Sequence, residues 1–181
     1  MAVVLLAAGG EPVRQALRYE RAAVFAGEYW RLLTGHLVHS SAAHLGLNLA
    51  GVALIAGLFP AHYALWQWLV ILLCSLVCID AGFVFYQPQL EWYVGLSGIL
   101  HGLLAGGAVA WWKRETKPLA LAMTLIFGAK LLWEQTHGAL PFSGDMRVIV
   151  DAHIYGALGG AVAGLILHLG LQGWPPRPRS L

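Results

Sequence analysis

Residues 92–112 read WYVGLSGILHGLLAGGAVAWW and contain no aspartate, glutamate, lysine or arginine. An α-helix needs about 20 mainly apolar residues to cross the hydrocarbon core of a bilayer, so this stretch is long enough to span one. Gly98, Gly102 and Gly106 follow at four-residue spacing, which places them on one face of such a helix. Small residues at this spacing let a second helix approach closely in lipid. The stretch therefore predicts a transmembrane helix with a small-residue packing face.

The composition of the whole chain favours the same kind of protein. Of its 181 residues, 59% are hydrophobic and 11% are Asp, Glu, Lys or Arg, against about 45–50% and about 25% in ordinary soluble domains. The mean hydropathy is +0.67. A soluble fold of this size could not bury so much apolar surface, and the composition also excludes a disordered chain and a disulfide-stapled secreted module. We expect a polytopic membrane protein built mostly of helices.

Four more apolar stretches are candidate membrane-spanning segments: residues 37–59, 64–86, 119–133 and 148–171. The third of them is short for a span. Residues 1–8 are apolar but too few to cross, and they lack the charged region and cleavage site of a signal peptide. We expect them to be the end of an incomplete first segment. The predicted fold is therefore an all-α bundle of six transmembrane segments, the first of them incomplete.

The expected organisation is a single transmembrane domain over residues 1–181. Its parts are the incomplete first segment, an external loop, a five-helix part and a flexible Pro-rich tail, at residues 1–8, 10–35, 37–171 and 172–181. Charges spaced by three and four residues predict a short surface helix around residues 12–19 within the external loop. A second polar loop is expected at residues 135–147.

The charges are few and set the expected orientation. A net charge of +2 is too small to indicate a nucleic-acid partner. Basic clusters at two segment ends should both be cytoplasmic by the positive-inside rule: Lys113, Arg114 and Lys117, and Arg177 and Arg179. The loop at 10–35 then lies outside, although it contains four arginines. Cys74 and Cys78 lie one helical turn apart in an apolar stretch, and we interpret them as small buried hydrophobic residues rather than a disulfide or metal pair.

Polar side chains inside the apolar stretches are the candidate functional residues, because each is costly in lipid unless it faces protein or water. They are His44, Asn48, Asp80, Ser97, His101, Lys130, Glu134, His153 and His168. Counted from the expected cytoplasmic ends, His44 and Ser97 both lie 16 residues in, or about 24 Å. His153 lies 19 residues from Gln172, a difference that helix tilt absorbs. Three polar groups from three helices are thus predicted to meet in one layer.

A second glycine stripe, Gly156, Gly160 and Gly164, lies in the last apolar stretch. His153 stands three residues before it, and Ser97 stands beside the first glycine of the stripe in residues 92–112. Helices packed stripe to stripe would bring a serine and a histidine to the same end. The alternative is that the glycines only assist packing against other helices.

This placement suggests nucleophilic chemistry. A serine hydroxyl is a weak nucleophile unless a base takes its proton, so Ser97 is the candidate nucleophile and His153 the candidate base. The sequence Gly95-Leu96-Ser97-Gly98 predicts a turn into a helix, where free backbone N–H groups of the first turn suit a developing oxyanion. Gly95 and Gly98 thus support the serine.

His44 and Asn48 share one helix face at i and i+4, and both carry N–H donors that could complete an oxyanion hole. The alternative is a pair of interhelical hydrogen bonds that hold the bundle together. No acidic residue is obviously placed to orient His153, since Asp151 lies on another side of the helix and is interpreted as its N-cap. We therefore expect a Ser–His dyad. His101, one turn after Ser97, is expected to pack against His153 rather than to act as a second base.

These residues resemble those of the rhomboid intramembrane serine proteases over nearly the whole chain from Tyr29. The matching pieces are Trp30-Arg31, His44-x-x-x-Asn48, Gly95-Leu96-Ser97-Gly98 and Ala152-His153-x-x-Gly156. The resemblance implies that Ser97 is the nucleophile and His153 the base. It also implies that His44 and Asn48 serve the oxyanion hole and that Trp30 and Arg31 have a structural role at the membrane surface.

One difference from most members of the family points to a particular branch of it. Most rhomboids have a tyrosine where His101 stands, stacked on the catalytic histidine. The short chain, the sequence GLSGILHG at residues 95–102 and the opening Glu28-x-Trp30-Arg31-x-x-x-Gly35-His36 are more similar to the rhombosortase branch. That resemblance implies substrates with a C-terminal Gly-Gly-type sorting anchor, cut near the outer, periplasmic face of a bacterial cytoplasmic (inner) membrane. The expected partners are membrane-anchored protein substrates and the lipid bilayer, with no nucleic acid and no cofactor.

Three other functions are considered. A general rhomboid would cut single-span proteins at helix-destabilised sites. A non-catalytic rhomboid-like binding protein would usually lack the serine or the histidine, and both are present here. A metal or haem protein is prompted by eight histidines, but their spacings do not repeat in a ligand pattern.

Overall fold

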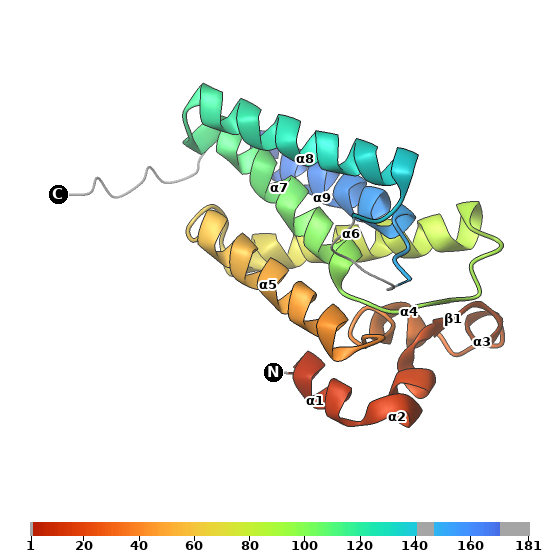
Figure 1. Cartoon of the computed structure of the whole chain (residues 1–181). Helices are drawn as coiled ribbons and strands as arrows, with labels where there is room; N and C mark the ends of the chain where they lie inside the picture. The colour runs from red at the N-terminus through yellow and green to blue at the C-terminus, as the bar shows by residue number, and fades with distance from the viewer. Residues whose placement is uncertain (1, 141–146, 171–181) are drawn as a thin grey trace.

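The computed structural model describes residues 2–140 and 147–170 (Figure 1). This part of the chain is mostly helical. Its elements, in order, are α1 (Ala2–Ala8), α2 (Gly10–Leu17), β1 (Tyr19–Glu20), α3 (Arg21–Phe25), α4 (Arg31–Thr34), α5 (Ala42–Leu58), α6 (Leu65–Tyr86), β2 (Trp92–Tyr93), α7 (Ser97–Arg114), α8 (Lys117–His137) and α9 (Asp151–Gly170). The predicted tail at 172–181 and the centre of the predicted loop at 135–147 lie outside the described residues.

Five long helices carry the predicted apolar stretches. Among the described helices, α6 and α9 are long and apolar enough to cross a membrane by length and composition, and α5 is apolar but shorter, with 17 residues. The mostly helical architecture with membrane-length apolar helices agrees with the expected class. The count of six transmembrane segments stays a prediction.

The ends of the helices do not coincide with the ends of the predicted apolar stretches, because local capping residues fix them. Ser41 caps α5, and its side chain accepts a hydrogen bond from the backbone N–H of His44 at 3.1 Å, so the helix begins after residue 37. Pro118 suits the first turn of α8, so this helix begins before residue 119, and it also continues past Trp133 to His137. Hydropathy follows the side chains, whereas capping fixes where backbone hydrogen bonding begins and ends.

α7 lies at the centre of the bundle, against α5, α6, α8 and α9 (Figure 1). The two glycine stripes face each other, as predicted. A Cβ added at Gly102 would lie 2.7 Å from the carbonyl oxygen of Gly156, and one at Gly164 would lie 3.1 Å from the Cα of Gly106. Any side chain here would push the helices apart, so the glycines set the separation of α7 and α9.

The outward faces of the long helices are apolar. Large hydrophobic side chains are exposed along α5, α6, α8 and α9, including Leu54, Val77, Phe85, Leu125, Ile126, Leu132, Val162 and Ile166. Exposed apolar surface of this extent is what a lipid environment would cover. Asp80 faces inward on α6, where its carboxylate lies 3.3 Å from Nε2 of the buried His36. One of the predicted intramembrane polar residues thus has a structural partner.

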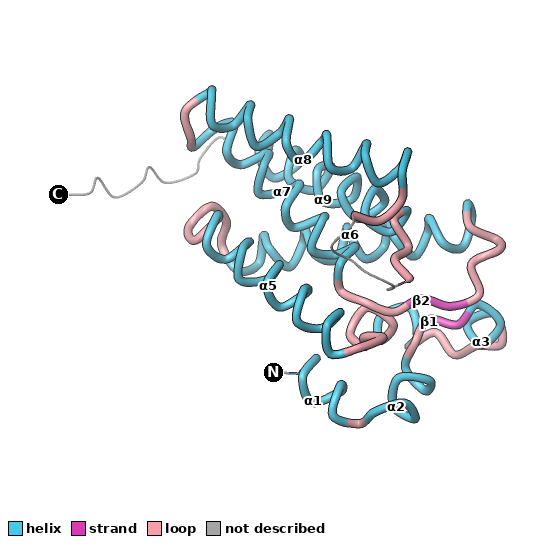
Figure 2. The backbone as a smooth tube through the Cα atoms, viewed as in Figure 1, coloured by secondary structure: helices cyan, strands magenta, loops and turns pink. Residues whose placement is uncertain are grey.

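The segment before α5 packs across one end of the bundle. The predicted surface helix is α2. β1 pairs with β2 in antiparallel register, with Tyr19 opposite Tyr93 (Figure 2). This two-residue pairing was not predicted, because so short a strand leaves no alternating pattern in the sequence.

Arg31 ties this segment together, in agreement with the structural role implied for it. Its guanidinium group donates to the carbonyl oxygens of Gln15 and Arg18, both at 2.9 Å, and pairs with Glu28 at 2.6 Å. Its neighbour Trp30 is half exposed. Arginine suits this task because its planar fork presents several donors in fixed directions.

Candidate active site

Ser97 is the first residue of α7 and follows a sharp turn at Gly95. Gly95 has φ +122°, a conformation that L side chains rarely adopt, and a Cβ here would lie 2.7 Å from Nε2 of His44. The turn is fastened by two bonds: the hydroxyl of Tyr93 donates to the carbonyl oxygen of Gly95 at 2.6 Å, and the N–H of Gly95 donates to the carbonyl oxygen of Gly35 at 3.0 Å. Only glycine meets both the conformation and the close approach.

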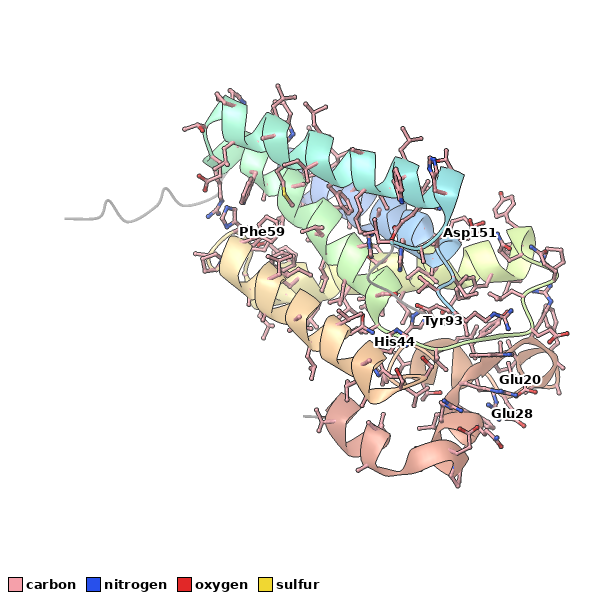
Figure 3. All side chains as sticks on the ribbon, in the orientation of Figure 1. Glu20, Glu28, His44, Phe59, Tyr93 and Asp151 are labelled. Carbon is pink, nitrogen blue, oxygen red and sulfur yellow. The ribbon has the colours of Figure 1, made fainter. Side chains whose placement is uncertain are left out.

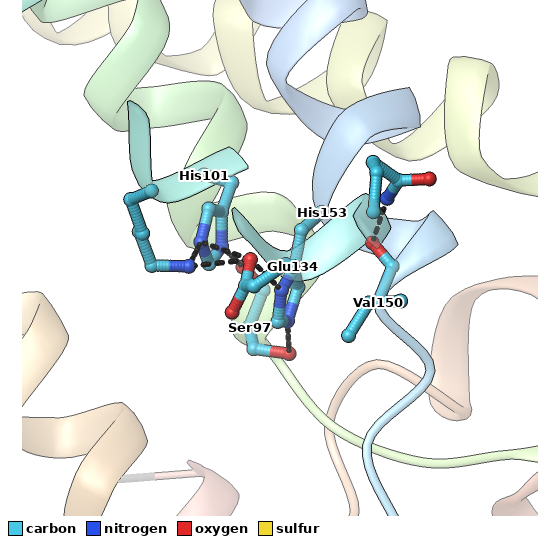
Figure 4. A network of polar contacts seen from close by, with 7 residues as sticks. Ser97, His101, Glu134, Val150 and His153 are labelled. Atoms are coloured by element: carbon cyan, nitrogen blue, oxygen red, sulfur yellow. Dashed lines mark hydrogen bonds and ion pairs between the residues drawn. The ribbon is translucent and has the colours of Figure 1, made fainter. Parts of the chain in front are cut away.

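Ser97 and His153 lie within hydrogen-bonding distance, from different helices. Nε2 of His153, in the first turn of α9, is 2.9 Å from Oγ of Ser97 (Figure 4). His153 is 4% exposed. The stripe-to-stripe contact of α7 and α9 accounts for this meeting, because it aligns the heads of the two stripes.

His101 stacks on His153. The ring centroids are 3.9 Å apart and the planes differ by 10°, as expected from its position one turn after Ser97. Nδ1 of His101 lies 2.7 Å from the carbonyl oxygen of Ser97. His101 therefore holds one face of the His153 ring.

The expectation that no acidic residue orients His153 is wrong. Oε2 of Glu134, on α8, lies 2.9 Å from Nδ1 of His153 (Figure 4). Lys130, one turn earlier, lies with its Nζ 2.6 Å from Oε2 of Glu134 and 2.6 Å from Nε2 of His101. A signal was present in the sequence: Glu134 lies 17 residues after Lys117, within one residue of the depth of His44 and Ser97, and Lys130 and Glu134 share one helix face.

Asp151 is the first residue of α9 rather than the residue before it, so its interpretation as the N-cap is corrected. Its carboxylate accepts a hydrogen bond from Nε2 of Gln87 at 2.7 Å. This contact joins α9 to the end of α6. Nδ1 of His153 is bonded to Glu134 instead.

His44 and Asn48 lie on the face of α5 that borders Ser97. Nδ1 of His44 lies 3.0 Å from Oγ of Ser40 and accepts from the N–H of Ser40 at 3.5 Å. An accepting Nδ1 leaves the proton of neutral His44 on Nε2, the atom next to Gly95. Asn48 is 5% exposed, and its Nδ2 has no protein partner among the described residues. Both side chains thus hold an N–H available beside Ser97.

His39 contributes to an uncharged environment next to His44. The two rings meet edge to face with centroids 5.0 Å apart. Burial lowers the pKa of His39, which precedes α5, to about 4, and the neighbouring His44 acts in the same direction. His39 is therefore neutral near pH 7.

A pocket of about 300 Å³ opens beside Ser97. Leucine and isoleucine side chains supply much of its lining, and the polar lining residues are Ser97, His153, His44, Asn48, Tyr93, His101, Lys130, Glu134 and Arg147. Figure 3 labels His44 at the start of α5 and Tyr93 before α7, two lining residues that come from different parts of the chain. A reacting group can therefore reach Ser97 through a mainly apolar cavity.

A comparison with protein-family models identifies the family of the chain. The model of the Rhomboid domain matches residues 26–170. The chain belongs to the rhomboid family. A search of curated proteins finds no significant match. Membership in a family of intramembrane serine proteases makes this an integral membrane protein of the class that acts on membrane protein substrates.

The arrangement in this rhomboid domain does not suit a metal ion. His101, Glu134 and His153 offer ligand atoms within 4.8 Å of one another. Two histidine ligands must aim their in-plane lone pairs at one point, whereas the stacked rings of His101 and His153 aim theirs side by side. The ammonium group of Lys130 also lies 2.6 Å from two of the three ligand atoms. The cluster is a hydrogen-bonded network.

Proposed function

We propose that this rhomboid-family chain is an intramembrane serine endopeptidase in which Ser97 is the nucleophile and His153 the general base. The observation that carries the proposal is the 2.9 Å contact between Oγ of Ser97 and Nε2 of His153. The contact lies in a pocket, within a domain of the rhomboid family.

The acylation step follows from this geometry. Nε2 of His153 takes the hydroxyl proton while Oγ of Ser97 forms a bond to the carbonyl carbon of the peptide, and the carbonyl π electrons move to oxygen. When the C–N bond breaks, His153 gives the proton to the departing amine. Water then enters and is activated by the same histidine, which releases the acyl group as an acid and restores the serine.

The developing oxyanion needs hydrogen-bond donors in a site without bulk water. We assign this role to Nε2 of His44, Nδ2 of Asn48 and the free N–H groups in the first turn of α7. The support is the direction of the His44 proton and the unpartnered amide of Asn48. Donors already fixed in place stabilise the transition state without reorganisation.

We further propose a rhombosortase-type substrate, a membrane-anchored protein that carries a C-terminal Gly-Gly sorting anchor. The support is the GLSGILHG sequence with His101 in place of tyrosine, together with a mainly apolar pocket of modest volume. The proposed location is the bacterial cytoplasmic membrane, with several crossings and the pocket open to the periplasmic side. Residues 37–171 form the catalytic part of a single domain over residues 1–181.

A fluorophosphonate probe tests the enzyme without any known substrate. An activated Oγ attacks the phosphorus and fluoride leaves. The wild-type chain in detergent micelles should label, and Ser97→Ala should not, while its thermal unfolding stays unchanged. Ser75→Ala, a buried serine on α6, is the matched control and should label like wild type. Equal labelling of Ser97→Ala and wild type would sink the proposed nucleophile, and no labelling of any form would favour a non-catalytic binding protein.

The substrate class is tested separately in liposomes. One reporter carries a C-terminal Gly-Gly anchor segment, and the other carries a single span with a helix-destabilised site. We expect cleavage of the first reporter and little of the second. The reverse result identifies a general rhomboid protease and leaves the catalytic proposal intact.

A further inference from the structure

Glu134 and Lys130 are charged side chains on a helix that also carries large, exposed apolar side chains. Glu134 is 3% exposed, while Leu125, Ile126 and Leu132 on the same helix are all more than 60% exposed. Charges at membrane depth are costly unless they are paired. The 2.6 Å contact of the two residues at i and i+4 supplies that pairing. The two charges would already compensate each other without a contact to any third residue.

The pair nevertheless makes two further hydrogen bonds, and all these bonds together form a closed ring. Glu134 bonds His153, which bonds the hydroxyl of Ser97. Lys130 bonds His101, which bonds the carbonyl oxygen of Ser97. The chain of bonds thus begins and ends on the same residue (Figure 4). Each bond is between 2.6 and 2.9 Å long.

The ring nitrogen that carries the proton in each histidine follows from its partners, because these partners can only accept or only donate hydrogen bonds. The carbonyl oxygen of Ser97 only accepts, so Nδ1 of His101 carries a proton and Nε2 is free to accept from the Lys130 ammonium group. The Glu134 carboxylate only accepts, so Nδ1 of His153 carries a proton. Nε2 of His153 is then the unprotonated nitrogen that faces Ser97, which is the tautomer that a general base needs.

This ring of hydrogen bonds also balances charge during proton transfer. In the resting state the Glu134 carboxylate and the Lys130 ammonium group cancel. When His153 takes the serine proton, it becomes an imidazolium next to the carboxylate, while the opposite charge develops on the oxyanion. The bond from Nδ1 to Glu134 becomes charge-assisted and stronger, and the weak screening at this depth increases its effect.

We propose that Glu134 is a positioning residue that fixes the tautomer and ring plane of His153, and that Lys130 acts through Glu134 by holding its carboxylate ionised and in place. The working unit is then a Ser–His–Glu triad with a lysine behind it, instead of a dyad. The inference rests on the proposed function, since it requires Ser97 and His153 to react. Glu134 takes up no proton in this scheme, and no bond to it is broken.

The experiment measures the rate constant of fluorophosphonate labelling and the thermal unfolding of the full chain in detergent. The variants are Glu134→Gln, Glu134→Asp, Lys130→Met and the double variant Glu134→Gln/Lys130→Met. Glu115→Gln is the matched control, because Glu115 also pairs with a histidine, His62, at 3.4 Å. Glu115 lies near the opposite end of α7, 18 residues from Ser97.

We expect Glu134→Gln to label about 10²–10⁴-fold more slowly than wild type, by analogy with loss of the carboxylate from other triads. Glu134→Asp should recover to within about tenfold of wild type, because it restores a carboxylate. Lys130→Met should slow labelling by about tenfold, and it should add nothing in the Glu134→Gln background. Glu115→Gln should label like wild type.

Three results overturn the inference. If Glu134→Gln labels at the wild-type rate while Ser97→Ala does not label, the chain is still a serine protease but Glu134 is not part of a triad. Equal loss in Glu134→Gln and Glu134→Asp, together with a lower unfolding temperature, assigns Glu134 to the fold alone. Additive effects of the two substitutions show that Lys130 does not act through Glu134. Labelling of Ser97→Ala is the separate result that would overturn the proposed function itself.

Discussion

The contact of α7 with α9 and the contact of α8 with the same site bring polar groups together by different means. Between α7 and α9, backbone meets backbone: a Cβ added at Gly160 would lie 2.6 Å from the Cα of Gly102. On α8, side chains make the contact, because Phe127 packs against Ala105 of α7 and Ala157 of α9. The first interface is a close contact of two backbones, whereas α8 meets the same helices through side chains, and its Lys130 and Glu134 reach the site.

This difference suggests that the two contacts have different roles in the site. The groups proposed to react, Ser97 and His153, lie on the closely packed pair, where a small error in helix separation would break their bond. The groups proposed to tune them come from α8, which meets α7 and α9 through side chains rather than backbone against backbone. Shape complementarity gives rigid placement, while ionic hydrogen bonds give direction to side chains that packing leaves free.

The largest expected effect is on the reactive histidine. His153→Ala should reduce the labelling rate by about 10³-fold or more, since the serine loses its base, while thermal unfolding changes little. His168→Ala, on the same helix but far along it, is the control and should label normally. Full labelling of His153→Ala would show that the proximity of the two side chains has no catalytic meaning.

The next effect tests the packed interface directly. Gly160→Ala forces a methyl group into the backbone of Gly102, so we expect a loss of about 1–3 kcal/mol in the free energy of unfolding. Labelling should fall as well, because α7 and α9 separate.

Gly128→Ala introduces the same methyl group at an exposed position of α8, where it would meet nothing within 4 Å, and should leave stability and labelling unchanged. Denaturant titration and probe labelling of both variants measure the contrast. Equal effects at the two positions would show that the loss does not come from the close contact of α7 with α9.

A smaller effect is expected at the ring that stacks on the base. His101→Tyr keeps an aromatic face against His153 but loses the bond that His101 receives from Lys130, so we expect activity within about tenfold of wild type. His101→Ala removes both contacts and should be slower than His101→Tyr. Equal rates in the two variants would show that stacking contributes nothing.

The smallest effect is expected at Asp151. Its partner is Gln87 rather than His153, and an asparagine can still accept that hydrogen bond. Asp151→Asn should therefore label within about twofold of wild type. Loss of labelling with an unchanged unfolding temperature would make Asp151, not Glu134, the carboxylate that serves the base.

Much of the site could be predicted because membrane helices turn sequence position into depth. The count of residues from the expected cytoplasmic ends placed His44 and Ser97 at one level, and the glycine stripes predicted which faces would meet. Glu134 satisfied the same depth count but was not assigned to the site, because the pairing of α8 with α7 and α9 has no comparable small-residue pattern. The two-residue pairing of β1 with β2 left no pattern to detect.

By itself the sequence determined the class of protein, the apolar helices, the small-residue faces and the residues able to do acyl chemistry, because these follow from composition and from the 3.6-residue period of a helix. Only the tertiary structure decided which carboxylate reaches His153, which nitrogen of that ring faces Ser97, and where Lys130 lies. Those outcomes depend on the rotation of α8 about its own axis and on distances between helices. Both are set by contacts among residues far apart in the chain, and no local period in the sequence records them.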